Sequence, residues 1–206
     1  MSMKWKGSLM SSLLAEPAIQ AVIPARITSI ILGPAVCAAL MLTGAAVAGG
    51  AGTRSTLTAA TTVLILPYLT GWAFKERRLP ATWPHRTRSA LRHGAAAAVG
   101  TAGLFATHAA GAPAELMQTS ITLIAGSVIL GLGRAWTNAS AHVGMVTLLA
   151  LWLASSLAPV SVFALLLVPV MVWSRVLLRE HTGTQAVSGI VTGIAVFVLY
   201  LILHSA

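Results

Sequence analysis

The sequence contains no aspartate, and its only acidic residues are four glutamates. Without aspartate the chain cannot build an Asp-rich magnesium–diphosphate motif or an aspartyl dyad, and few carboxylates remain to hold a metal ion. The single cysteine, Cys37, excludes a disulfide framework and a cysteine metal cluster. We therefore expect no metal or other cofactor, and a hydrolytic reaction here would run without a metal. The glutamates are Glu16, Glu76, Glu115 and Glu180.

Charge is also scarce, because only 8% of the 206 residues are charged while 57% are hydrophobic. The mean hydropathy is +0.86, and several uncharged runs approach the roughly twenty residues that a helix needs to cross a bilayer. Backbone polar groups in lipid must be satisfied within the protein, which a helix achieves by itself. The sequence therefore predicts an all-α, polytopic helical membrane protein with about six to seven transmembrane helices in one bundle.

The predicted organisation is an interfacial segment over residues 1–27, followed by a single transmembrane domain over 28–206. Gly33-Pro34 predicts a kink inside the first span. The Ala- and Gly-rich third span is the weakest, and it either crosses the membrane or re-enters on one side. The predicted spans are 28–49, 56–74, 94–112, 117–133, 143–158, 160–178 and 186–204.

The positive charge is gathered in a basic loop predicted over residues 75–93, where Pro80 and Pro84 should prevent a helix. The formal net charge is +9, and the positive-inside rule places this loop and the N-terminus in the cytoplasm. We expect an integral protein of a prokaryotic plasma membrane whose partners are membrane lipids rather than nucleic acid. The oligomeric state stays open.

Two polar segments, 134–142 and 173–185, interrupt the apolar C-terminal half. Two predicted spans separate them, so both segments return to one side of the membrane. That side is cytoplasmic if 94–112 crosses the membrane and external if it does not. Arginines beside a membrane are costly, which indicates a functional site, although each alone could be a snorkelling topology signal. The segments contain Arg134, Asn138, Ser140, Ala141, His142, Ser174, Arg175, Arg179, Glu180, His181 and Gln185.

These residue types together suit the binding of a phosphate group. The guanidinium groups of Arg134, Arg175 and Arg179 offer planar donor forks that match phosphate oxygens. A helix that begins at Asn138 or Ser140 would direct free N–H groups toward the same anion. Two histidines, one in each segment, add groups for proton transfer and nucleophilic attack.

The second segment resembles a family signature. Ser174-Arg175, five residues, His181, three residues and Gln185 resemble the Ser-Arg-x5-His-x3-Asp pattern of the type-2 phosphatidic acid phosphatase superfamily, which includes membrane lipid phosphate phosphatases. The first segment, residues 139–142, resembles that superfamily's Pro-Ser-Gly-His motif. The resemblance covers about 127–200, includes small residues Gly189 and Gly193 after the signature, and implies a phosphatase-type core over about 117–206.

The resemblance implies a metal-free, two-step hydrolysis of a lipid phosphate or an isoprenoid (di)phosphate. His181 matches the nucleophile that becomes a phosphohistidine, and His142 matches the general acid. Arg175, Ser140 and the Ala141 N–H match the phosphate-binding groups. Arg134, Asn138, Ser174 and Arg179 are further candidates for that role.

The chain departs from the family pattern in three places. In the Pro-Ser-Gly-His motif, Ala139 and Ala141 replace the proline and the glycine. The first motif, Lys-x6-Arg-Pro, is matched only by Ser127, six residues, Arg134 and Ala135, so the lysine is missing. Gln185 replaces the signature aspartate; its carbonyl oxygen can accept from the Nδ1–H of His181 one helical turn away, but it brings no charge. Glu180 is adjacent to His181, so within a helix it would point elsewhere.

Three other functions remain open on this pattern. The chain could be a catalytically reduced homologue that binds or transports a phosphorylated lipid, because the lysine and the aspartate are absent. It could be a phosphotransferase, in which a hydroxyl group replaces water. A prenyl-diphosphate enzyme that ionises its substrate ranks lowest, because such enzymes rely on magnesium bound by aspartate.

Overall fold

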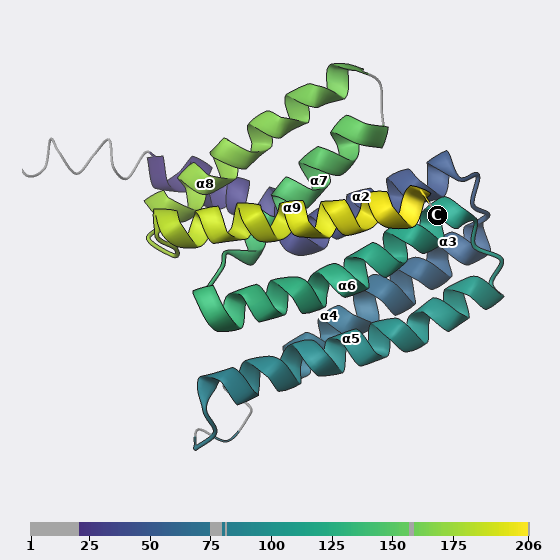
Figure 1. Ribbon diagram of the computed structural model, residues 1–206, viewed down its shortest axis with the longest axis horizontal. Coiled ribbons are helices and arrows are strands. Elements are labelled where there is room, and N and C mark those ends of the chain that lie inside the picture. Colours follow the sequence, from purple (N-terminus) through teal and green to yellow (C-terminus); the bar gives the residue numbers. More distant parts are fainter. Residues whose placement is uncertain (1–20, 75–79, 81, 157–158, 206) are drawn as a thin grey trace, which may run out of the picture.

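The computed structural model describes residues 21–74, 80, 82–156 and 159–205, and these residues form a bundle of helices without any strand (Figure 1). The predicted all-α class is therefore confirmed. Most of the predicted interfacial segment and part of the predicted basic loop lie outside the described residues. The helices are α2 (Pro34–Ala48), α3 (Thr53–Ala59), a π-helical turn (Ala60–Ile65), α4 (Leu66–Ala73), α5 (His85–Ala109), α6 (Ala114–Thr137), α7 (Ala141–Ser156), a 3-10 helix (Pro159–Leu166), α8 (Leu167–Leu177) and α9 (Gly183–Ser205).

The predicted kink at Gly33-Pro34 is present. Residues 21–31 are helical, and the chain bends by 43° before α2 begins at Pro34. Proline has no N–H to continue the first helix, but its fixed φ suits the first turn of the next one. The first helical segment therefore begins well before the predicted span at residue 28.

Among the described residues, three helices are long and apolar enough to cross a membrane, Thr53–Ala73, Ala114–Thr137 and Gly183–Ser205, and the bent pair 21–31 and 34–48 makes a fourth if it counts as one span. These helices agree with an integral membrane protein. Two shorter apolar helices, Ala141–Ser156 and Ser161–Leu177, are below that length. The predicted count of six to seven spans therefore stays a prediction.

The basic loop predicted over 75–93 is shorter than expected, because α5 already begins at His85. Pro84 does not prevent this helix; it is the residue just before it, where the missing N–H costs nothing. As a result Arg88, Arg92 and His93 lie on a helix rather than in a loop. This difference matters for the site described below.

Helices α7 and α9 pack closely through glycines. A Cβ atom on Gly193 would lie 2.5 Å from the carbonyl oxygen of Gly144, and one on Gly189 would lie 2.7 Å from that of Ser140. No side chain fits at either position, so the two backbones touch, as small residues allow between membrane helices. This contact joins the first turn of α7 to the first turns of α9.

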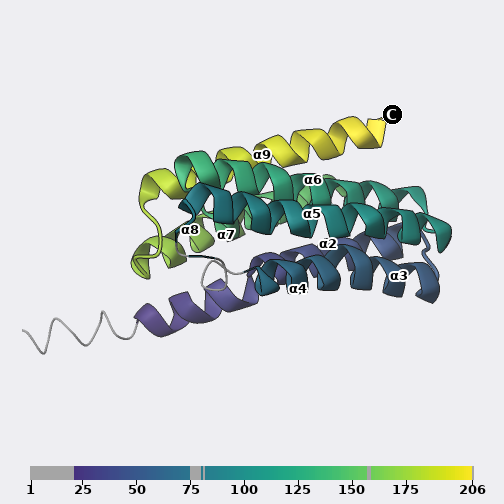
Figure 2. The same cartoon turned by 90° about the horizontal axis from the view of Figure 1, so that it is seen from below.

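The bundle collects several helix ends at one side. Figure 1 shows the start of α5, the end of α6, the start of α7, the end of α8 and the start of α9 toward the end opposite the C-terminus. The same bundle viewed from below shows α2, α3 and α4 on the side of the bundle away from α9 (Figure 2). The basic start of α5 and both polar segments therefore share one end of the molecule.

Candidate functional site

The turn between α8 and α9 reverses the chain through a left-handed residue. Arg179 has φ 54°, its N–H donates to the carbonyl of Val176 at 3.0 Å, and the N–H of Glu180 donates to that of Arg175 at 3.1 Å. This pair of bonds is the Schellman pattern that ends a helix. The turn brings Glu180 and His181 back over the end of α8. Arg179 itself is exposed, so its observed role is in the turn.

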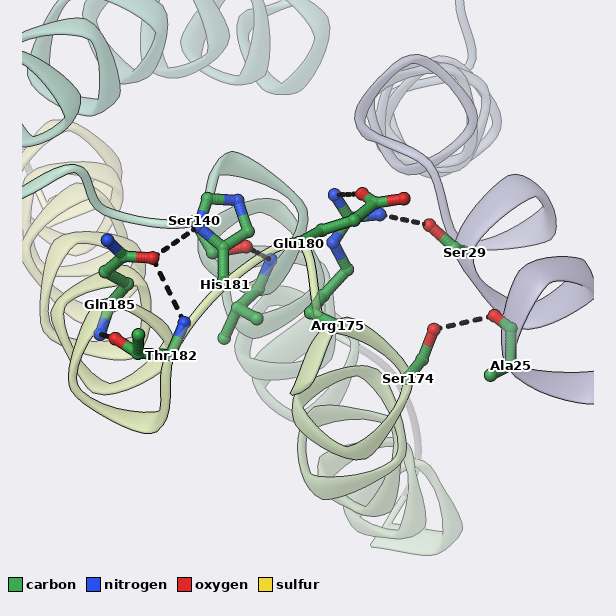
Figure 3. A network of polar contacts seen from close by, with 10 residues as sticks. Ala25, Ser29, Ser140, Ser174, Arg175, Glu180, His181, Thr182 and Gln185 are labelled. Atoms are coloured by element: carbon green, nitrogen blue, oxygen red, sulfur yellow. Dashed lines mark hydrogen bonds and ion pairs between the residues drawn. The ribbon is translucent and has the colours of Figure 1, made fainter. Parts of the chain in front are cut away.

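A capping box starts α9. The backbone N–H of Gln185 donates to Thr182 Oγ1 at 3.3 Å, and the backbone N–H of Thr182 donates to Gln185 Oε1 at 3.1 Å (Figure 3). These reciprocal bonds satisfy two N–H groups at the helix start. They also fix the Gln185 side-chain amide, because its oxygen, not its nitrogen, must face the Thr182 N–H.

The predicted contact between Gln185 and His181 is present, with 3.1 Å between Oε1 and Nδ1. Since Oε1 can only accept, the His181 ring must carry its proton on Nδ1 when it is neutral. The lone pair then lies on Nε2, at the opposite side of the ring. The capping box thus sets the tautomer that a nucleophilic histidine needs.

The turn between α6 and α7 lies against the start of α9. Ser140 precedes α7, and the N–H of Val143 points to Ser140 Oγ at 3.5 Å, so Ser140 is the predicted N-cap. The Ser140 N–H donates to the backbone carbonyl of Gln185 at 3.1 Å, which ties the two helix starts together. Asn138 does not cap α7; it ends α6 in the left-handed region with φ 52° and is exposed.

Arg175 is the most deeply buried cation of the site, with 6% of its surface exposed. Its guanidinium forms an ion pair with Glu180 and donates to Ser29 Oγ at 2.5 Å, while its Nε has no partner among the residues that the structure describes (Figure 3). A buried guanidinium with one orphan N–H has capacity for another acceptor. Its neighbour Ser174 instead donates to the carbonyl of Ala25 at 2.6 Å, so this hydroxyl fastens the first helix to α8.

The two histidines and the arginines act on one another electrostatically. Burial is the main reason that the pKa of His142 falls to about 4, and the charges of Arg175, His181 and Arg134 also lower it. Burial likewise lowers the pKa of His181; the hydrogen bond to Gln185 opposes this shift, and the charges of Arg175 and Arg134 add to it. Both histidines are therefore neutral at pH 7 when no anion is bound.

A cavity of about 640 Å³ adjoins these groups. His142, Ala141 and Arg134 line it from α7 and α6, and Ser29, the acceptor of the Arg175 bond, lines it from the first helix. His181 and Arg175 are not among its lining residues. Most of the other lining residues are apolar and come from α2, the π-helical turn, α4 and α6, including Val36, Ala38, Val63, Leu64, Pro67, Leu123, Ile124 and Leu130.

Sequence reasoning missed two residues of this cavity, Arg92 and His93 on α5. Both were assigned to a loop that only sets topology, and no local pattern distinguishes them from the other basic residues there. The described residues contain no group of three or more His, Cys, Asp or Glu side chains placed to hold a metal ion. No protein-family model, curated protein or solved structure matches the chain.

Proposed function

We propose that the protein is an integral-membrane hydrolase that removes phosphate from a lipid phosphate or an isoprenoid (di)phosphate through a phosphohistidine on His181. The observation that carries the proposal is the bond between Gln185 Oε1 and His181 Nδ1, which leaves Nε2 with a free lone pair in the field of the buried Arg175 and the half-buried Arg134. The motif resemblance of residues 139–142 and 174–185 supports the same function.

In the first step Nε2 of His181 attacks phosphorus, and the bond between phosphorus and the lipid oxygen breaks. His142 gives its proton to the leaving oxygen. The substrate's negative charge offsets the arginines that disfavour a protonated His142, so the histidine gains its proton when substrate binds. Arg175 and the starts of α7 and α9 stabilise the charge on the phosphoryl oxygens.

In the second step water attacks the phosphohistidine. The neutral His142 takes a proton from that water, the N–P bond breaks, and inorganic phosphate leaves with His181 restored as the Nδ1–H tautomer. Gln185 cannot neutralise the cationic histidine as an aspartate would, but it keeps the ring in place through both steps. The phosphate also competes with Glu180 for Arg175, because the two side chains form an ion pair.

The phosphate would bind at the cytoplasmic end of the bundle, with the lipid tail in the apolar cavity. The basic start of α5 and the two histidine turns lie toward the same end in Figure 1, and the positive-inside rule puts such an end in the cytoplasm. This reasoning does not depend on the number of spans. It favours substrates whose phosphate is exposed on the inner leaflet.

The test is phosphate release by the purified protein in detergent with EDTA present. The substrates are phosphatidic acid, phosphatidylglycerophosphate, and prenyl mono- and diphosphates, and His181→Ala and His142→Ala are measured in parallel. We expect release from at least one lipid that both substitutions abolish. Absence of release from every lipid, or release that survives His181→Ala, would contradict the proposal.

One observation favours a second candidate, a protein that binds or transports a phosphorylated lipid. The cavity is lined by His142 and Arg134 but not by His181 or Arg175, so a lipid could occupy it without reaching the nucleophile. Under this reading the lipid binds with equal affinity to the wild type and to His181→Ala, and no phosphate is released.

A further inference from the structure

The cavity receives positive charge from a helix that lies outside both polar segments. Arg92 and His93 line it from α5, whereas Arg134 and His142 line it from α6 and α7. Among the residues that the structure describes, no acidic side chain lines it. The cavity is mostly apolar and has cationic side chains from several helices. It therefore suits an amphiphile whose head group carries more than one negative charge.

The positions of the α5 residues follow from contacts with two glycines. A Cβ on Gly131 would lie 2.9 Å from Cγ of His93, so His93 packs against α6 one turn before Arg134. The Nε of Arg92 is the nearest atom to a Cβ on Gly71, at 3.8 Å, so Arg92 lies beside α4. Arg92 therefore reaches the cavity from α5 and Arg134 reaches it from α6, at similar heights along the bundle.

The guanidinium groups of Arg92 and Arg134 are without a partner in the described part of the chain. Both residues are half-buried, and their side chains form no hydrogen bond or ion pair with another residue that the structure describes. A partly buried arginine beside apolar side chains is costly unless an anion or water satisfies its donors. Arg175, in contrast, already has Glu180 and Ser29.

We propose that Arg92 binds a second phosphate group, so that the site selects lipid diphosphates over lipid monophosphates. The inference rests on the proposed function for the position of the terminal phosphate, near His181 and Arg134. The inner phosphate then lies against Arg92, and the hydrocarbon tail follows the apolar lining from Leu123 and Ile124 toward Val63.

The test is equilibrium binding in detergent to protein carrying His181→Ala, which prevents turnover. The probes are a prenyl diphosphate, the matching prenyl monophosphate, inorganic pyrophosphate and inorganic phosphate. We expect Arg92→Gln to weaken diphosphate binding about tenfold or more, the effect of losing a charge-assisted hydrogen bond, and to change monophosphate binding less than about twofold. Arg92→Lys, which keeps the charge and loses the fork, should fall between.

Arg54→Gln is the matched control, because it removes one exposed arginine from the start of α3, away from the cavity. It should leave all four affinities unchanged. Equal weakening of both lipids by Arg92→Gln, or no weakening of either, would overturn the inference. Inorganic pyrophosphate that binds as tightly as the prenyl diphosphate would show a free anion as the ligand and would overturn the lipid part.

The result is separable from that of the proposed function. A diphosphate preference that depends on Arg92, in a wild type that releases no phosphate, would support this inference and contradict the hydrolase. Hydrolysis of both lipids with equal efficiency, unchanged by Arg92→Gln, would support the hydrolase and contradict this inference.

Discussion

Helix α9 has a glutamine–histidine pair at each end, and the two pairs have nearly the same distance between Nδ1 and Oε1. His181 and Gln185 lie before and within its first turn, with 3.1 Å between Nδ1 and Oε1; His204 and Gln118 meet at its last turn, with 3.0 Å. In both pairs a backbone group fixes the amide, Thr182 N–H in one and the Leu203 carbonyl in the other. The hydrogen bond therefore cannot by itself make a reactive histidine.

The surroundings of the two pairs differ. His204 is exposed, stacks on Tyr200 and ends a helix, where the dipole favours a cation. His181 precedes a helix start and is part of a site with Arg175, Arg134 and His142. Only His181 therefore lies where a phosphate anion would be stabilised. The comparison indicates that charge and helix polarity, rather than the local bond, would distinguish the proposed reactive pair from a structural one.

Removing each histidine gives the largest expected difference between the pairs. His181→Ala should lower phosphate release about 10⁴-fold or more, because it removes the nucleophile. His204→Ala should leave kcat unchanged and cost at most about 1 kcal/mol of stability, the typical net contribution of a hydrogen bond. Phosphate release and thermal unfolding measure both; a comparable loss of rate in His204→Ala would remove the distinction.

Arg175 is the cation that the His204 pair lacks. Arg175→Ala should lower kcat by about 10² to 10³, the effect of deleting one group that stabilises transition-state charge. Glu180→Gln releases the same guanidinium from its ion pair, and we expect a lower KM for the lipid phosphate. A rise in KM in Glu180→Gln would mean that the ion pair favours substrate binding, which would contradict this expectation.

Substituting the two glutamines should change kcat by a smaller factor than substituting the two histidines. Gln185→Ala should lower kcat by about 10²-fold, since His181 loses its fixed tautomer and α9 loses part of its capping box. Gln118→Ala should leave kcat unchanged. Steady-state rates of both variants on the same substrate test this difference. Gln185→Glu is a conservative variant that should recover activity.

The pH dependence follows from the depressed histidines. Burial lowers the pKa of His181 and takes that of His142 to about 4, so the unfolded chain binds more protons than the folded one below about pH 6.5. Stability should be full above pH 6.5 and fall as pH drops toward 4, as thermal unfolding would show. In the pH profile of kcat/KM, the fall on the acid side, which we assign to protonation of His181, should also lie below pH 6.5.

Gln185→Ala sharpens that prediction. The bond from Gln185 raises the pKa of His181, so its loss should move the acid limb to lower pH. Gln118→Ala should leave the limb in place. A shift toward higher pH in Gln185→Ala would contradict the assignment of that limb to His181.

The smallest expected effect is at Arg179, one of the arginines that the sequence marks for phosphate. Arg179 is exposed and left-handed, so Arg179→Gly should relieve backbone strain and raise stability by up to about 1 kcal/mol. Phosphate release should change less than about twofold. A large loss of rate would return Arg179 to the phosphate-binding groups.

The sequence predicted the features of this site that depend on local patterns. Proline at position 34 marks the kink, Ser140 marks a helix start, and the spacing of four residues brings Gln185 to His181. Each of these relations acts within one or two turns of the chain, where geometry follows directly from residue type.

Other features depend on contacts between distant segments. The ion pair of Glu180 with Arg175 requires the left-handed turn at Arg179, which residue type does not favour. Ser29 and Arg175 are 146 residues apart in the sequence, and Arg92 reaches the cavity because α5 begins at His85, within the predicted loop. None of these contacts leaves a periodic or motif signal.

The most direct test of the account is a search for phosphate bound covalently to His181. The purified protein would be mixed with a ³²P-labelled lipid phosphate, quenched in alkali within milliseconds to seconds, and mapped by peptide mass spectrometry. The account predicts an acid-labile, alkali-stable label on the peptide that contains His181, absent in His181→Ala and still formed in His204→Ala. Phosphate release by the wild type without any such label, or a label that persists in His181→Ala, would contradict it.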